Sequence, residues 1–263
     1  MSRRILLQLF CLTLVTTACG HSDDPTRSIL MATAPSLEAA PSAVAQAPGE
    51  RYPLELGTRW EYAFVDSQRF RANGDAEFGP WKTTHGRVTS EASRTTEIEG
   101  HLYTVIDELI YFPSLWAPGV PYRDRQFLRQ DASALYSFPN AGGIGAPGGA
   151  AGEIPTPTFH ESVLLVYPPR VGARWKVRLR SDYEFEVEAI EPVRTVLGVF
   201  PAARVRGFLH SGQPGTEPDL TWYGKPGVLR QRSKRMDDAG LPNGQRGIRE
   251  TISERLLTSF VPG

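Results

Sequence analysis

Short segments in which apolar and polar residues alternate dominate the chain after residue 50. Successive side chains of a β-strand point to opposite faces, so a two-residue period predicts a strand with one buried and one solvated face. These segments are also rich in aromatic and β-branched residues, which favour strands. Turn-forming pairs such as Asn73-Gly74 and Glu99-Gly100 separate them. The expected strands include residues 60–65, 102–106, 175–179, 183–187 and 220–223.

This pattern predicts a mainly β fold built from antiparallel curved sheets, either a sandwich or an open half-barrel. No window shows a long apolar period of 3.6 residues, so we expect few helices, all of them short. The best candidate for a helix is residues 159–166, and a strand there is the alternative.

Two distant segments, residues 52–60 and 167–175, both read Tyr-Pro-x-x-x-Gly-x-Arg-Trp. The proline keeps the approach extended, the glycine permits a tight turn, and the tryptophan opens a strand with a large aromatic residue. We therefore expect one β domain over residues 51–263, made of two similar halves at 51–141 and 159–263, with a Gly-rich connector at 142–158. Chance is the alternative, because only five positions match.

The first residues have the pattern of an export signal. Arg3 and Arg4 precede an apolar run that ends in small residues at Thr16, Thr17 and Ala18. The run is shorter than the roughly 20 residues that cross a bilayer. We expect residues 1–18 to be a signal peptide.

Cysteine usage adds an expected lipid anchor. The chain has two cysteines, and Cys11 would leave with the signal peptide. Cys19 would then be the first residue of the mature chain, where acylation removes an unpaired thiol from an oxidising compartment. A secreted protein with an incidental cysteine is the alternative. Residues 19–50, rich in Ala, Pro and Ser, are expected to form a disordered tether.

The charge balance gives no hint of a polyanionic partner. Lysine and arginine total 29, and aspartate and glutamate also total 29. Without a global field, the sequence favours neither nucleic acid nor an anionic surface as a partner. We read the basic residues at 230–235 as the solvated face of a strand.

Patterns that would indicate a cofactor are weak. Residues 143–148 match Gly-x-Gly-x-x-Gly in letters. A dinucleotide site needs a helix directly after this turn to bind the pyrophosphate, and Pro147 and the glycines that follow disfavour a helix there. The histidines are scattered without the spacing of metal ligands. We therefore expect no cofactor, no metal and no catalytic residue.

Two classes of function remain from the residues. The preferred one is a non-enzymatic module that binds lipid, peptide or an envelope protein on a curved sheet, or scaffolds a complex. Its groove would be lined by aromatic residues, namely Trp60, Tyr62, Trp175 and Trp222. The alternative is a cell-surface hydrolase with a site built around His160, His101 or His210.

The segment ending in Ala18-Cys19 resembles the lipobox of bacterial lipoproteins. With Tyr-Pro-Leu-x-x-Gly-x-x-Trp at 52–60, Gly-x-Phe-x-Ala at 198–202 and Trp-Tyr-Gly-Lys-Pro-Gly-Val at 222–228, the chain resembles uncharacterised bacterial envelope lipoproteins. That resemblance implies anchoring to a membrane through Cys19, with the outer membrane favoured because glycine follows the cysteine. The layout is more distantly similar to half-barrel lipoprotein carriers, whose concave apolar face holds acyl chains.

Overall fold

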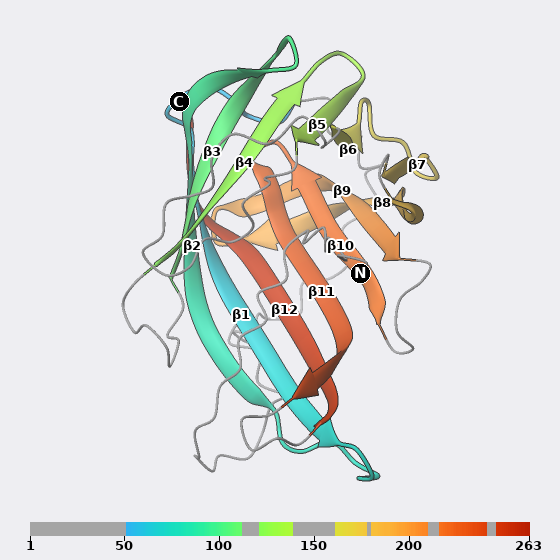
Figure 1. Ribbon diagram of the computed structural model, residues 1–263. Helices are drawn as coiled ribbons and strands as arrows, with labels where there is room; N and C mark the ends of the chain where they lie inside the picture. Colours follow the sequence, from blue (N-terminus) through green and yellow to red (C-terminus); the bar gives the residue numbers. More distant parts are fainter. Residues whose placement is uncertain (1–50, 112–120, 139–160, 178–179, 210–215, 241–245) are drawn as a thin grey trace, which may run out of the picture.

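The protein forms one antiparallel sheet of twelve strands, seen in the computed structural model as a strongly curved surface (Figure 1). The structure describes residues 51–111, 121–138, 161–177, 180–209, 216–240 and 246–263. The strands are β1 (Arg59–Ala72), β2 (Lys82–Ile98), β3 (His101–Tyr111), β4 (Tyr122–Gln130), β5 (Ala134–Phe138), β6 (Ser162–Val166), β7 (Arg174–Val177), β8 (Arg180–Thr195), β9 (Gly198–Leu209), β10 (Glu217–Gly224), β11 (Gly227–Gly240) and β12 (Arg246–Val261).

The order of strands across the sheet is β6-β5-β4-β3-β2-β1-β12-β11-β10-β9-β8-β7. Each strand therefore pairs with its sequence neighbour, except that β1 pairs with β12 and no ladder joins β6 to β7 among the described residues. The mainly β, antiparallel, curved fold predicted from alternation is confirmed. The β1·β12 ladder joins β1–β6 and β7–β12 into one continuous sheet, and the expected division into two similar halves stays a prediction.

The described residues contain no helix. The helix considered for residues 159–166 is wrong where the structure describes it, since residues 162–166 form β6 and pair with β5. The short apolar run of β6 completes the sheet edge, so its tertiary pairing decides its conformation. The signal peptide, the tether, Cys19 and the connector at 142–158 lie outside the described residues.

The two segments that share Tyr-Pro-x-x-x-Gly-x-Arg-Trp form the same turn. The backbone N–H of Gly57 donates to Ala92 O, and that of Gly172 donates to Val187 O, both at 2.8 Å. Both glycines have a positive φ, +89° and +86°. The strand after each turn begins with an arginine whose guanidinium lies 3.1 Å from a carboxylate on the next strand, in the pairs Arg59–Glu91 and Arg174–Glu186.

We expect alanine at Gly57 to destabilise the fold by about 1–2 kcal/mol, because a residue with a Cβ is strained in the left-handed region. The nearest atom to the added Cβ would be Gly263 Cα at 3.7 Å, so the cost is conformational and not steric. Gly172→Ala should lose a similar amount, since nothing lies within 4 Å of its Cβ position. Urea denaturation of both variants measures the losses.

Gly79→Ala is the control for that comparison. Gly79 is not in the left-handed region, and its added Cβ would lie 3.4 Å from Phe70 O, an ordinary contact. A loss at Gly79 as large as at Gly57 would contradict backbone strain as the cause.

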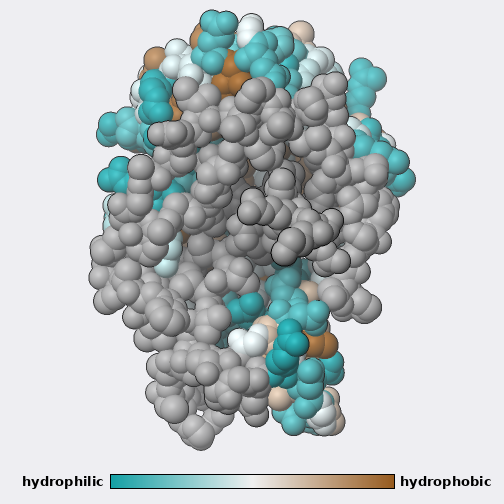
Figure 2. Space-filling view, viewed as in Figure 1, coloured by the Kyte–Doolittle hydropathy of each residue, from teal (hydrophilic) through white to brown (hydrophobic). Residues whose placement is uncertain are grey.

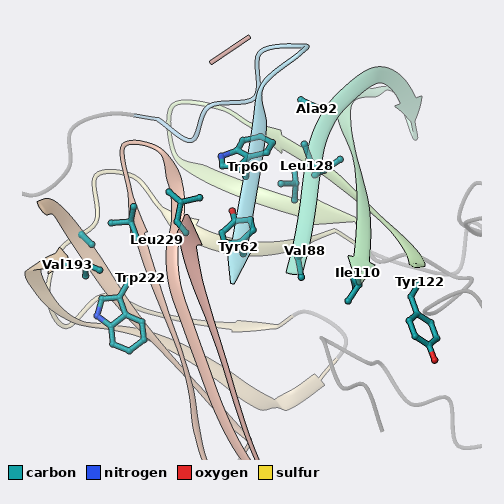
Figure 3. Close-up of a cluster of buried hydrophobic side chains, with 13 residues drawn as sticks. Trp60, Tyr62, Val88, Ala92, Ile110, Tyr122, Leu128, Val193, Trp222 and Leu229 are labelled. Carbon is teal, nitrogen blue, oxygen red and sulfur yellow. The ribbon is translucent and has the colours of Figure 1, made fainter. Parts of the chain in front are cut away.

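Three clusters of buried side chains form the core. The largest takes side chains from β1–β4 and from β8–β12 and contains Trp60, Tyr62, Val88, Trp222 and Leu229, among others (Figure 3). The second joins β5 and β6 to β8 and β9, and the third joins β2–β5. Outside these clusters, the described surface seen in the view of Figure 1 is mostly hydrophilic, with small hydrophobic patches (Figure 2).

Candidate functional site

A buried ion pair lies inside the largest apolar cluster. Glu108 on β3 is 2% exposed and Arg255 on β12 is 8% exposed. Arg255 Nη2 lies 2.7 Å from Glu108 Oε1, and the Ser90 hydroxyl donates to the same oxygen at 2.7 Å. Because β2 and β1 separate β3 from β12 in the sheet, this network spans four strands of the curved face.

The sheet register explains how these groups meet. Ser90 lies directly opposite Glu108 in the β2·β3 ladder, and opposite Trp60 in the β1·β2 ladder. The next pairs along the same face are apolar, with Val88 opposite Ile110. Ser90 and Glu108 thus form a polar cross-strand pair on a face whose neighbouring pairs are apolar. This position places the carboxylate in a low-dielectric environment.

Two tyrosines complete the environment of the pair. The guanidinium of Arg255 stacks over the ring of Tyr62, with its central carbon 3.9 Å from the ring centroid. This contact combines cation–π attraction with burial. Tyr52 adjoins the same region, with its ring centroid 6.0 Å from that of Trp60.

The electrostatics keep both tyrosines neutral. Burial is the largest influence and raises the pKa of Tyr62 and of Tyr52 well above the usual value for tyrosine. The neighbouring Glu108 charge raises both pKa values further, while Arg255 opposes it. For Arg255, burial is the largest single influence and lowers the pKa, but Glu108, Tyr62 and Tyr52 together outweigh it and the net pKa is raised. At neutral pH the site therefore contains a guanidinium beside two protonated phenols.

The hydrogen bonding of the network is incomplete. Glu108 Oε2 is buried and has no hydrogen-bond partner among the described residues. A buried acceptor left without a donor costs about 1–3 kcal/mol, so native structures rarely keep one unless a water, an ion or a ligand supplies the donor. The arrangement can therefore accept a hydrogen bond from a hydroxyl, amine or amide at Oε2, in a surrounding of apolar side chains.

The four aromatic residues predicted to line a groove fall in two clusters of the core, with Trp60, Tyr62 and Trp222 in the largest and Trp175 beside the second. Trp60 and Tyr62 are 1% and 2% exposed and adjoin the Glu108–Arg255 pair. Trp222 lies beside Val193 in the same cluster (Figure 3), and its indole N–H donates to Glu191 Oε1 at 2.6 Å. Trp175 is only partly buried and stacks on Phe185 at 5.7 Å in the second cluster. A groove lined by all four remains a prediction, and a ligand could reach Trp60 and Tyr62 only if the interior opened.

The residues suggested for a hydrolase are not brought together in the part of the chain that the structure describes. His101 is exposed at the start of β3, away from the buried pair, and His160 and His210 lie outside the described residues. The described residues include no group of three or more His, Cys, Asp or Glu side chains that could hold a metal ion. None of them forms a helix with the length and apolarity needed to cross a bilayer.

Sequence reasoning missed Glu108, Ser90 and Arg255, although a signal was present. Glu108 stands between Ile106 and Ile110, at the spacing of residues that share one face of a strand. Arg255 similarly stands two positions before Leu257, which is fully buried. A charge that interrupts an apolar face in this way marks a candidate buried site, but only the register shows that the two charges meet.

Comparison with known proteins gives little to add. No family model matches the chain, and no curated protein matches it. A protein of Bacteroides fragilis, described as assumed to be exported and as having a YmcC-like fold, is 11% identical, with 80% of this chain and 98% of that chain covered and a TM-score of 0.30. An assumed lipoprotein of Parabacteroides distasonis is also 11% identical, with 80% and 97% covered and a TM-score of 0.31. Likenesses this low identify neither the fold nor the function of the chain.

Proposed function

We propose that the protein is a non-enzymatic lipoprotein of the bacterial envelope, held by an acyl anchor on Cys19, which binds an amphipathic molecule inside its curved sheet. The ligand would place an apolar body among the side chains around Trp60 and Tyr62. Its polar head would donate a hydrogen bond to Glu108. Scaffolding of an envelope complex and hydrolysis around His160, His101 or His210 are the alternatives.

The unsatisfied oxygen of Glu108 is the observation that carries this proposal. Stability alone does not explain a glutamate at this position, because a buried ion pair often stabilises a protein no more than apolar residues of similar volume do. Arg255 and Ser90 both contact Oε1, so Oε2 is left available to a ligand. The network holds the carboxylate in place, which reduces the ordering cost of binding.

The seam between β6 and β7 supports a route into the interior. A side-chain hydrogen bond links the two strands, from the Trp175 indole N–H to Val163 O at 2.9 Å. One such bond contributes about 0.5–1.5 kcal/mol, which is far less than a full ladder of backbone pairs. Separation of β6 from β7 therefore costs less than separation of any neighbouring pair of long strands.

The test measures ligand binding to the full chain and to Glu108→Gln. Lipid extracts of the purified proteins are analysed by mass spectrometry, and binding of phenylnaphthylamine, a neutral fluorescent amine with an N–H donor, is titrated. We expect the substitution to weaken binding about ten- to a hundredfold, since a hydrogen bond to a charged acceptor is worth about 1.5–3 kcal/mol.

Glu91→Gln is the matched control, because Glu91 is an exposed carboxylate on β2 that pairs with Arg59. It should bind like the unsubstituted chain. Thermal unfolding of each protein separates loss of binding from loss of fold. Equal binding by folded Glu108→Gln, or an unsubstituted chain that carries no amphiphile and binds no probe, would overturn the proposal.

A further inference from the structure

The hairpin formed by β8 and β9 ends in a cluster of exposed aliphatic side chains. Val196 is 68% exposed, Leu197 43% and Val199 57%. Scattered exposed apolar residues are normal on proteins, but here three lie within four residues of one hairpin tip.

The tip is held in one conformation by its own hydrogen bonds. Thr195 is buried, and its Oγ1 accepts a hydrogen bond from the backbone N–H of Leu197 at 3.0 Å. Thr195 also pairs with Gly198 at the end of the β8·β9 ladder. The aliphatic side chains are therefore displayed by a preorganised turn, which lowers the entropic cost of burying them against a partner.

The ends of β8 and β9 next to the tip also carry exposed and mostly apolar side chains. Pro192 lies opposite Pro201, and Arg194 lies opposite Val199, all four exposed. Arg194 is the single charged residue in residues 192–201, and the segment contains no acid. The exposed face of the hairpin end is thus apolar with one guanidinium.

The hairpin of β2 and β3 provides an internal contrast. Its tip also carries an exposed aliphatic residue, Leu102, at 66% exposure. There Leu102 lies opposite Glu97, and Glu99 and His101 stand between them in the turn, all exposed. A polar, acidic tip of this kind is well solvated by water, whereas the aliphatic side chains of the β8–β9 tip are not.

The chemistry of the tip fits the interfacial layer of a bilayer. Aliphatic side chains gain by entering the boundary between headgroups and acyl chains, and a guanidinium binds lipid phosphate while its stem stays apolar. An acidic residue would oppose both effects near anionic lipids, and the segment has none.

The lipid anchor predicted at Cys19 would keep the β domain close to a bilayer. With an acyl group at Cys19, the tether expected over residues 20–50 would have a root-mean-square reach of about 30 Å for about 30 residues. Tethering of this kind holds a second contact at an effective concentration in the millimolar range, so a small apolar tip suffices.

We propose that the tip of the β8–β9 hairpin inserts into the interface of the membrane that carries the anchor, with Arg194 on lipid phosphate, and so fixes the orientation of the sheet on the bilayer. This docking does not depend on the interior ligand.

The experiment places an environment-sensitive fluorophore at Val199→Cys in the full chain, expressed so that Cys19 is processed and acylated, on vesicles of phosphatidylethanolamine and phosphatidylglycerol. Mass spectrometry reports the state of Cys19 separately. We expect a blue shift of emission and quenching by lipids brominated on their acyl chains. The same label at Leu102→Cys should keep water-like emission.

A second variant keeps the result specific to the tip. Leu197→Asp in the chain labelled at residue 199 should reduce the quenched fraction about tenfold, because a carboxylate enters the apolar layer poorly. If the label at 199 stays water-like, or if bromolipids quench it no more than the label at 102, the proposal is overturned. Failure of phenylnaphthylamine binding with normal quenching at 199 would overturn the interior site alone.

Discussion

Replacement of Glu108 by leucine is expected to destabilise the protein by about 3–5 kcal/mol, the cost of removing one partner of a buried ion pair. The substitution leaves the Arg255 guanidinium, 8% exposed, in the apolar interior without the carboxylate that lies 2.7 Å away. Denaturation in urea, monitored by tryptophan fluorescence, measures the change in the free energy of unfolding.

The double variant Glu108→Leu/Arg255→Met shows whether the loss comes from charge. Two apolar side chains of similar volume need no desolvated partner, so this variant should recover most of the stability or exceed that of the original chain. The same variant should lose the proposed ligand site. If the double variant is as unstable as Glu108→Leu alone, packing and not the uncompensated charge explains the loss.

The second large effect is expected at Trp60. This side chain is 1% exposed, and its indole N–H donates to Pro226 O, in the turn between β10 and β11, at 2.6 Å. Trp60→Ala should cost about 3–5 kcal/mol, as for other large side chains removed from a core. Thermal unfolding and urea denaturation both measure it.

Trp175→Ala tests the same residue type at the matching position of the other turn. Trp175 is only partly buried, and its indole N–H donates to Val163 O at the seam. Its removal should cost clearly less than the removal of Trp60, but it should loosen β6 from β7 and speed hydrogen exchange in those strands. Equal losses at the two positions would show that the seam is as firmly packed as the centre of the sheet.

The fold class could be predicted because the alternation of apolar and polar residues is a local property. In β1, for instance, Trp60 and Tyr62 are buried, whereas Arg59 is exposed. The conformation of residues 162–166 was harder to predict, since the short apolar run in β6 fits a helix or a strand equally well. Its pairing with β5 decides between them, and that pairing is a long-range property of the sheet.

The candidate site could not be found by the motifs used on the sequence. Glu108 and Arg255 lie 147 positions apart and belong to strands that are not neighbours in the sheet. Aromatic residues drew attention because they are large, yet Trp60, Tyr62 and Trp222 are buried members of one core cluster (Figure 3). A charge within an apolar stripe was the more informative signal.

The β1·β12 ladder also has a kinetic consequence. It pairs Arg59 with Val261, so one edge of β1, the first strand in the sequence, stays uncovered until β12, the last strand, has been made. Contacts between residues this far apart slow folding, because chain entropy is lost before they form. The central ladder of the sheet therefore forms only after synthesis reaches its last strand, so the sheet cannot be completed while the chain is still being made.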